Sequence, residues 1–209
     1  LGAEVHLVPG GYAEAEQAGL AHAASTGMTW ISPYNDGQII AGQGTLALEI
    51  LAQQTTLADS TWVIPAGGGG LVSGIGAVLD KTNHRPRLVA VQSEASAFLH
   101  ALYHTGSQEQ ITEYASLADG LAGSVEPGSV TIPLTRQLVD EFLLVSEDQI
   151  AHAIAYAWTH YQQRIEGYAA VSLAAVLNGY ISTRPAVIII TGGNIQSEVF
   201  DKIIGSYAE

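Results

Sequence analysis

TWVIPAGGGGLVSGIGAVLDK, residues 61–81, is the stretch of this sequence that decides the fold. It opens with five β-prone residues, 61–65, which predict a short strand. Four successive glycines follow, and residues 71–81 then predict a helix. A strand, a tight glycine loop and a helix in this order form the repeating unit of a parallel α/β sheet.

The segments on both sides repeat this alternation. AVIII at 186–190 is a continuous apolar run, which is typical of a strand buried on both faces. Ser146 and Gln149 have the spacing of a capping box at the start of a helix. Further strands are expected at 87–92 and 141–145, short ones at 3–8 and 28–31, helices at 12–26, 39–53, 95–105, 131–138, 147–162, 168–179 and 195–204, and a long loop at 106–130. The pattern predicts a doubly wound, mostly parallel sheet.

Composition excludes several classes of partner and site. The chain has 20 acidic against 7 basic residues, a net charge of −13, whereas nucleic acids and anionic membrane surfaces bind clustered Lys and Arg. Cys is absent, which excludes disulfides, Cys-ligated zinc and a thiol nucleophile. The apolar runs are far shorter than the ~20 residues of a membrane span. Apolar residues make up 47%, enough for a substantial core.

The loop Gly67-Gly68-Gly69-Gly70 is the strongest local signal for a ligand. Glycines have no side chains to block an anion, and their N–H groups can converge on it together with the positive end of the following helix. Leu71 follows where a Walker loop has Lys, and Gln92 ends the next strand where a dinucleotide-binding fold has an acidic residue. The loop therefore predicts a phosphate site. A plain flexible turn is the alternative.

Thr191-Gly192-Gly193-Asn194 is a second glycine-containing loop, directly after the apolar strand. Ligands of open α/β sheets lie at the carboxyl ends of the strands, so two such loops indicate one crevice between them. These four residues alone equally favour an ordinary turn with Asn194 as the helix N-cap.

Taken together, these segments resemble the fold type II enzymes that use pyridoxal 5′-phosphate (PLP), specifically the threonine dehydratase and serine racemase group. The resemblance runs in order over nearly the whole chain, and the IAGQGT block favours the dehydratase branch. It rests on LGAEVHLVPGGYAEAEQAG (1–19), SPYNDGQIIAGQGTLALEIL (32–51), VIPAGGGGLVSGI (63–75), LVAVQSE (88–94), SLADGLAG (116–123), IEGYAAVSLAAVL (165–177) and VIIITGGNI (187–195). It implies a fold like that of the tryptophan synthase β-subunit.

The resemblance implies roles for individual residues. Gly67, Gly68, Gly69 and Gly70 would hold the PLP phosphate. Thr191 would face the pyridine nitrogen, where a neutral hydroxyl, unlike a carboxylate, does not keep the nitrogen protonated; the weaker electron sink suits β-elimination.

Two acidic residues complete the implied site. Glu166 would lie beside the cofactor, although Gly167-Tyr168-Ala169 departs from the family pattern that follows it. Asp119 lies in the loop where some relatives bind a cation, but a single carboxylate is more typical of a turn.

The resemblance also implies which parts the 209 residues lack. In the family, the Schiff-base lysine and the loop that holds the ring hydroxyl precede the segment that matches Leu1. Lys81 and Lys202 are the only lysines, and at ~1.5 Å of helix rise per residue they lie roughly 16 Å and 12 Å from the two glycine loops. We therefore expect these residues alone to be inactive, because the N-terminal part is lost, is supplied by another chain, or catalysis has been abandoned.

The domain organisation follows from the sharp turn at Pro33. Residues 1–33 would be a truncated small lobe, and residues 34–209 the large cofactor-binding domain. The expected function is a PLP-dependent threonine or serine dehydratase, a lyase of amino-acid metabolism in a cytoplasmic homo-oligomer. A serine racemase or another β-eliminating lyase, and a non-catalytic remnant that binds a phosphate ligand, are the alternatives.

Overall fold

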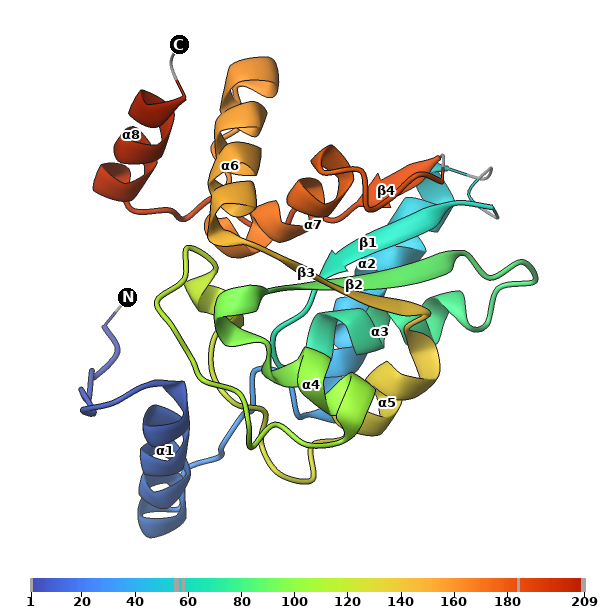
Figure 1. Ribbon diagram of the computed structural model, residues 1–209. Coiled ribbons are helices and arrows are strands. Elements are labelled where there is room, and N and C mark those ends of the chain that lie inside the picture. Colours follow the sequence, from blue (N-terminus) through green and yellow to red (C-terminus); the bar gives the residue numbers. More distant parts are fainter. Residues whose placement is uncertain (1, 55–56, 58, 184, 208–209) are drawn as a thin grey trace.

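A parallel sheet of four strands forms the centre of the molecule in the computed structural model, which describes residues 2–54, 57, 59–183 and 185–207. The strands are β1 (Thr61–Pro65), β2 (Arg87–Ser93), β3 (Glu141–Val145) and β4 (Ala186–Ile188), in the order β3-β2-β1-β4 (Figure 1). Thr61 pairs with Arg87 on one side and with Ala186 on the other. The carboxyl ends of β1 and β4 therefore lie at the same edge of the sheet.

Helices cover both faces of this sheet. The helices of the described residues are α1 (Tyr12–Thr26), which lies apart from the sheet, α2 (Gly37–Gln53), α3 (Gly70–Leu79), α4 (Phe98–Thr105), α5 (Thr131–Leu138), α6 (Glu147–Tyr161), α7 (Gly167–Leu177) and α8 (Ser197–Ser206), with short 3-10 turns at Glu94–Ser96 and Asp119–Leu121. The α2, α3, α4 and α5 group lies on one side, and α6, α7 and α8 lie on the other (Figure 1). The prediction of a doubly wound α/β fold is confirmed.

The alternation of side chains along the strands explains the two layers. Val63 on β1 points into the core beneath α6 and α7, whereas its neighbours Trp62 and Ile64 point into the core beneath α2 and α3. All three are fully buried. A strand that is apolar on both faces has to be covered on both, which is why helices lie above and below the sheet.

Local signals set several helix ends where the sequence places them. The Ser146 hydroxyl accepts a hydrogen bond from the Gln149 N–H at 3.3 Å, and the Gln149 side chain accepts one from the Ser146 N–H at 3.0 Å, so the predicted capping box is present. Asp36 caps α2 through its carboxylate, 2.8 Å from the N–H of Gln38. Gly27 ends α1 in the left-handed region, with φ of 74°.

Two predicted short strands do not form. Residues 3–8 and 28–31 are irregular, and their side chains are largely exposed, with Val5 at 77% and Leu7 at 92%. A strand needs a neighbouring backbone for its hydrogen bonds, and the four-stranded sheet of the described residues offers none to these segments. Their β-prone side chains therefore do not produce strands here.

β4 is shorter and less buried than its apolar sequence predicts. The run 186–190 was expected to be buried on both faces, but the strand covers only Ala186–Ile188, and each of its three residues is half-buried. The strand order explains the difference, because β4 is a sheet edge and pairs only with β1 among the described strands.

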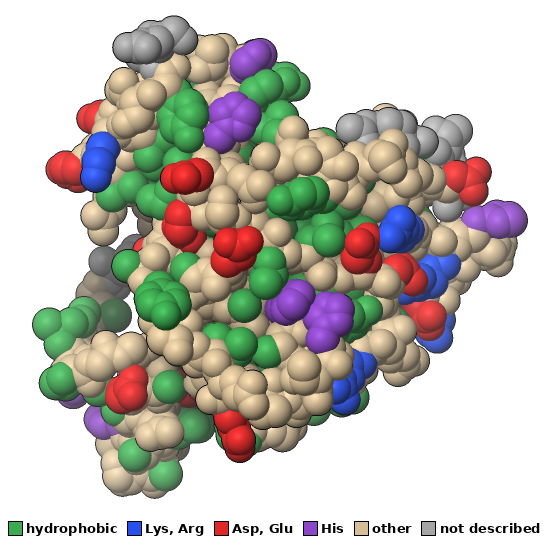
Figure 2. Space-filling model, in the orientation of Figure 1, with side chains coloured by type: hydrophobic (Ala, Val, Ile, Leu, Met, Phe, Trp, Pro, Cys, Tyr) green, Lys and Arg blue, Asp and Glu red, His purple; other side chains and the backbone are tan. Residues whose placement is uncertain are grey.

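Most of the segment before Pro33 extends beyond the sheet and its covering helices, although Tyr12 packs against Gly123. α1 projects away from the sheet in Figures 1 and 2, and Glu16 is the only buried residue of that helix. Several large apolar side chains of this segment are exposed, among them Met28 at 64% and Ile31 at 63%. The division of the chain at Pro33 stays a prediction.

Several of the basic side chains on the surface form ion pairs. Arg85 lies 2.9 Å from Asp140, and Arg87 lies 2.5 Å from Glu141. On the face in Figure 2, Lys and Arg side chains lie largely beside Asp and Glu. None of the helices in the described part of the chain is both long and apolar enough to span a membrane.

Candidate cofactor site

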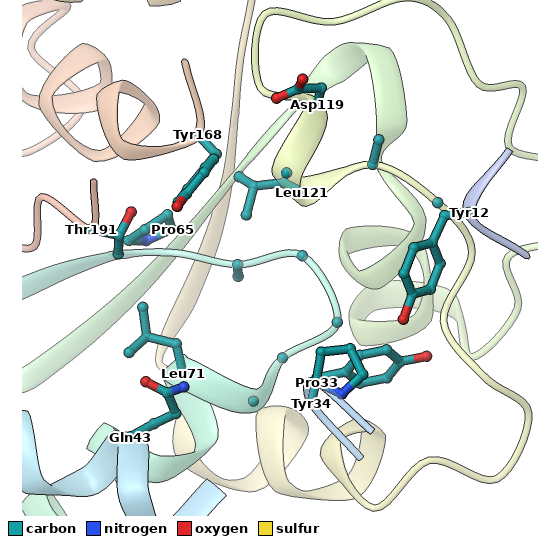
Figure 3. Close-up of a pocket in the computed structure, with 18 of the residues that line it drawn as sticks. Tyr12, Pro33, Tyr34, Gln43, Pro65, Leu71, Asp119, Leu121, Tyr168 and Thr191 are labelled. Atoms are coloured by element: carbon teal, nitrogen blue, oxygen red, sulfur yellow. The ribbon is translucent and has the colours of Figure 1, made fainter. Parts of the chain in front are cut away.

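A cavity of about 510 Å³ opens at the carboxyl ends of β1 and β4. This volume lies within the ~300–1,000 Å³ range of small-molecule sites. Figure 3 shows side chains that reach it from α1, the loop before α2, the 119–124 segment and α7. The lining residues are Tyr12, Pro33, Tyr34, Gln43, Pro65, Ala66, Gly67, Gly68, Gly69, Gly70, Leu71, Asp119, Gly120, Leu121, Ala122, Gly123, Ser124, Tyr168 and Thr191. Thr191, the first residue of the second glycine-containing loop, therefore lines the same crevice as the four glycines.

The four glycines form the floor of this cavity between β1 and α3. Gly69 is the N-cap of α3, with φ of 88°, a conformation that suits glycine. In the part of the chain that the structure describes, no hydrogen bond uses the N–H of Gly67, Gly68 or Gly69. Free N–H groups at a helix N-terminus make a site for an anion such as phosphate.

Close packing fixes this loop, so a plain flexible turn does not describe it. A Cβ on Gly68 would lie only 2.3 Å from Cγ of Tyr34, and one on Gly67 would lie 2.9 Å from Cα of Leu121. Tyr34 is itself 8% exposed, and its hydroxyl accepts a hydrogen bond from the Glu126 N–H at 2.8 Å. The glycines are thus required by the protein's own packing as well as by any ligand.

Thr131 holds the loop from the other side. Its hydroxyl donates a 2.7 Å hydrogen bond to the carbonyl of Gly68 and lies 2.8 Å from the hydroxyl of Ser129. Thr131 is fully buried at the start of α5. Sequence reasoning missed this residue, since it lies 63 positions from its partner and in no recognisable motif.

Glu147 fixes the segment that carries Asp119. Its carboxylate accepts hydrogen bonds from the Ser93 hydroxyl at 2.6 Å, the Ser116 hydroxyl at 2.7 Å and the Leu117 N–H at 2.6 Å. The carboxylate lies in the first turn of α6, where the helix dipole also favours a negative charge. This residue, too, was not singled out by the sequence.

The remaining predicted site residues, Thr191, Glu166 and Asp119, are divided between two neighbouring cavities. Thr191 lines the cavity with the glycine loop, whereas Glu166 lines an adjoining cavity of about 460 Å³. Asp119 lines both cavities. Tyr168 stands beside Thr191 in the first cavity, with its hydroxyl directed toward it (Figure 3).

Tyr168 is held tightly between two glycines. A Cβ on Gly120 would lie 2.5 Å from Cδ1 of its ring, and one on Gly192 would lie 3.1 Å from its hydroxyl. Burial, followed by the hydrogen bond and the charge of Glu166, raises the pKa of Tyr168 to about 12.

The mouth of the cavity is lined by phenols close to carboxylates. The Tyr12 hydroxyl donates a 3.1 Å hydrogen bond to Glu16. Burial and the carboxylate of Glu16 hold the pKa of Tyr12 well above its usual range, and burial raises the pKa of Tyr34 to about 12. Burial also raises the pKa of Glu16, and the charge of Glu126 adds to this shift. Tyr12 brings α1 into contact with the site.

Lys81, Lys202 and Asn194, which the sequence analysis also considered, lie outside the lining of the first cavity. Neither lysine lines the cavity; Lys81 is at the end of α3, paired with Asp80 at 2.9 Å. Asn194 is not a helix N-cap, since α8 begins at Ser197 after Gln196. The described residues contain no group of three or more His, Cys, Asp or Glu side chains that could hold a metal ion.

A family model described as "Pyridoxal-phosphate dependent enzyme" matches residues 1–192. The chain belongs to the pyridoxal-phosphate-dependent enzyme family. The cavity fits PLP by its own geometry, because unpaired N–H groups and a helix N-terminus suit the phosphate and the space beyond them suits a ring.

Members of this PLP family resemble the chain in sequence over most of its length. The L-threonine ammonia-lyase of Thermotoga maritima is 37% identical over 205 residues, which cover 98% of this chain and 50% of that protein. The catabolic L-threonine dehydratase TdcB of Escherichia coli K12 is 38% identical over 183 residues, 86% of this chain and 55% of that protein. The chain spans about half the length of these curated relatives.

Solved structures give the same fold. The processed form of threonine deaminase isoform 2 from Solanum lycopersicum has a TM-score of 0.85 and 26% identity, over 98% of this chain and 56% of that one. Maize serine racemase has a TM-score of 0.84 and 25% identity, over 99% of this chain and 64% of that one. The expected tryptophan-synthase-β-like PLP fold is confirmed.

Proposed function

We propose that this chain is the cofactor-phosphate-binding part of a PLP-dependent ammonia-lyase that converts L-threonine or L-serine to a 2-oxo acid and ammonia. The observation that carries the proposal is the set of unpaired N–H groups of Gly67, Gly68 and Gly69 in one cavity with Thr191. The relatives named threonine ammonia-lyase and threonine dehydratase support the reaction class. When bound, PLP supplies an electron sink for the charge left on the substrate α-carbon.

The residues of this chain position the cofactor. Gly67–Gly70 and the N-terminus of α3 would bind the phosphate, and the hydroxyl of Thr131 keeps the Gly68 carbonyl in place. Thr191 would hold the pyridine ring from its nitrogen side. Glu166 acts on the site from the adjoining cavity, through the side of Tyr168.

The amine that binds the cofactor and moves the α-proton comes from outside the 209 residues. Lys81 and Lys202 both lie outside the cavity lining, and a lysine used for this chemistry has to reach the cofactor. We therefore expect the chain alone to be inactive, and residues 1–33 to be part of a lobe that the remainder of the enzyme completes. We also expect the complete enzyme to be a cytoplasmic homo-oligomer. Sedimentation of the complete enzyme tests its oligomeric state.

Racemisation is the second candidate function. The maize serine racemase structure matches 99% of this chain with a TM-score nearly equal to that of the threonine deaminase structure. The residues that clamp the substrate carboxylate in this family belong to the part that precedes the match. The cavity residues alone therefore do not rank threonine above serine, or elimination above racemisation.

Deamination and racemisation assays test the proposal. The chain with added PLP is compared with free PLP for 2-oxo acid release from L-threonine and L-serine and for formation of D-serine. We expect no turnover above free PLP until a lysine-bearing N-terminal segment is added. Turnover by the chain alone, together with a borohydride-reduced adduct on Lys81 or Lys202, would show that the cofactor is placed wrongly. PLP binding that persists without turnover, even with that segment, would favour the non-catalytic remnant.

A further inference from the structure

Two histidines lie side by side on α4, outside the lining of both cavities described above. His100 and His104 are four positions apart, which places them on the same face of the helix. Their ring centres are 4.4 Å apart. His100 is half-buried and His104 is exposed, so the pair is open to solvent. The proposed function gives neither side chain a task.

Other aromatic rings hold both imidazoles in place. His100 meets the ring of Phe142 edge to face, with ring centres 5.5 Å apart and an angle of 83°. His104 meets the ring of Tyr103 at 4.8 Å and 87°, and the Tyr103 hydroxyl is itself fixed by a 3.2 Å hydrogen bond to the carbonyl of Val139. The two rings are therefore positioned before any ligand arrives, which lowers the entropy lost on binding.

The ring nitrogens of the pair remain available. Within the part of the chain that the structure describes, neither imidazole takes part in a hydrogen bond or an ion pair; the hydrogen bond from His100 to Gln92 uses the backbone N–H. A neutral imidazole has one nitrogen with a free lone pair, and that nitrogen is a common metal ligand. Two such nitrogens one helical turn apart on the same face can bind a single metal ion.

The distance between the rings indicates the geometry of that ion. With metal–nitrogen bonds of about 2.0–2.1 Å, an ion lies about 3.2 Å from each ring centre, so two rings at a right angle around it have centres about 4.5 Å apart, against about 5.2 Å at the tetrahedral angle. The observed 4.4 Å matches the right angle. Square-planar and tetragonal nitrogen sites are typical of Cu²⁺ and Ni²⁺, and Cu²⁺ binds the more tightly of the two.

A second pair of histidines is less well organised. The rings of His6 and His22 are 5.2 Å apart, which is close to the tetrahedral value. His6, however, lies in the irregular segment before α1, and its Nε2 atom is 3.0 Å from the carboxylate of Glu4. Both members of the α4 pair lie on one helix and keep their nitrogens unpaired among the described residues.

We propose that His100 and His104 form a binding site for Cu²⁺ on the surface of α4, with the two imidazole nitrogens at a right angle and water as the remaining ligands. The site shares no residue with the cavity that would hold the cofactor. Its existence therefore does not depend on the proposed function.

The test uses Cu²⁺ alone, without the cofactor, at a pH of about 8, where an ordinary imidazole is neutral. Calorimetry measures the affinity of the parent chain and of His104→Gln, a substitution at an exposed position that leaves the fold intact. We expect the affinity to fall at least about tenfold, because the second nitrogen of a chelate binds at a high effective concentration. His152→Gln is the matched control, since His152 is an exposed histidine of α6 whose ring neighbours are Tyr156 and Tyr207, and it should change nothing.

Two further measurements locate the ion and identify it. Paramagnetic Cu²⁺ broadens the NMR signals of nearby nuclei, so the imidazole signals of His100 and His104 should disappear at the lowest Cu²⁺ concentrations. Zn²⁺, which prefers the tetrahedral angle, should bind more weakly than Cu²⁺. Equal Cu²⁺ affinity in His104→Gln and the parent chain overturns the proposal, as does loss of binding in His22→Gln with none in His104→Gln. Tighter binding of Zn²⁺ than of Cu²⁺ overturns the right-angle geometry on which the choice of ion rests.

Discussion

Replacing Thr131 by Val removes two hydrogen bonds from the wall of the cradle, one to the Gly68 carbonyl and one with the Ser129 hydroxyl, with almost no change in shape. The Thr131 hydroxyl is fully buried and donates to the Gly68 carbonyl at 2.7 Å. Leaving a buried carbonyl without its donor costs about 1–3 kcal/mol of unfolding free energy. For a chain of this size each kcal/mol corresponds to a shift of roughly 2–4 °C in melting temperature.

The same substitution is expected to weaken ligand binding. Without the Thr131 hydroxyl, the Gly68 peptide can rotate, and the N–H groups on either side of it lose their fixed direction. We expect the affinity for pyridoxine 5′-phosphate to fall about tenfold, equivalent to about 1.4 kcal/mol. Affinity for pyridoxine, which lacks the phosphate, should not change.

Urea unfolding and isothermal titration calorimetry measure the two effects. Thr105→Val is the matched control, because its hydroxyl donates to the Ala101 carbonyl at 2.9 Å on an exposed face of α4, away from the cavity. If Thr131→Val unfolds no more easily than Thr105→Val, the hydrogen bonds of Thr131 contribute no stability. If it binds pyridoxine 5′-phosphate as the parent does, Thr131 does not orient the cradle.

Three further predictions concern the walls of the cavity. Gly68→Ala places a methyl 2.3 Å from Cγ of Tyr34 and should cost about 1–3 kcal/mol in unfolding free energy by overpacking; an unchanged urea midpoint would show that the loop is not held against Tyr34. Glu147→Gln should lose about 1–3 kcal/mol and speed amide exchange at Leu117, while exposed Glu198→Gln should change neither; equal exchange rates in the two variants would contradict the role of Glu147. Tyr34 and Tyr168 have raised pKa values in the folded chain, each about 12, so their protonated forms add stability that is complete below pH ~10 and is lost as the pH rises through 12. Unfolding free energy should therefore fall between pH 10 and 12, less steeply in Tyr34→Phe and Tyr168→Phe, and a profile that neither variant changes would contradict the assignment.

The parts of the fold that could be predicted from sequence are those set by neighbours along the chain. The strands at 61–65 and 141–145 and the helix at 131–138 have the predicted bounds. Their apolar patterns and flanking turn residues act over a few positions. The Ser146 capping box is likewise decided within four residues.

The parts that could not be predicted depend on distant partners. Residues 3–8 carry a β-prone pattern, yet no neighbouring backbone among the described residues turns it into a strand. Glu147 reaches Ser93 across 54 positions, and Tyr34 reaches Glu126 across 92. No local pattern marks such pairs. The four glycines and Thr191 could be predicted because loops at strand ends have a recognisable composition. Nothing in the sequence, however, indicated that Glu166 would line a different cavity.

Binding of the cofactor phosphate by the N–H groups of Gly67–Gly70 is the central step of the proposed function. The direct measurement is a titration of the ¹⁵N-labelled chain with pyridoxine 5′-phosphate, followed through the backbone amide signals. The account predicts that these four amides show the largest shifts, that they saturate with the same dissociation constant as the ring signals, and that pyridoxine without phosphate leaves them in place. Shifts that are largest elsewhere, or that pyridoxine reproduces equally well, would contradict it.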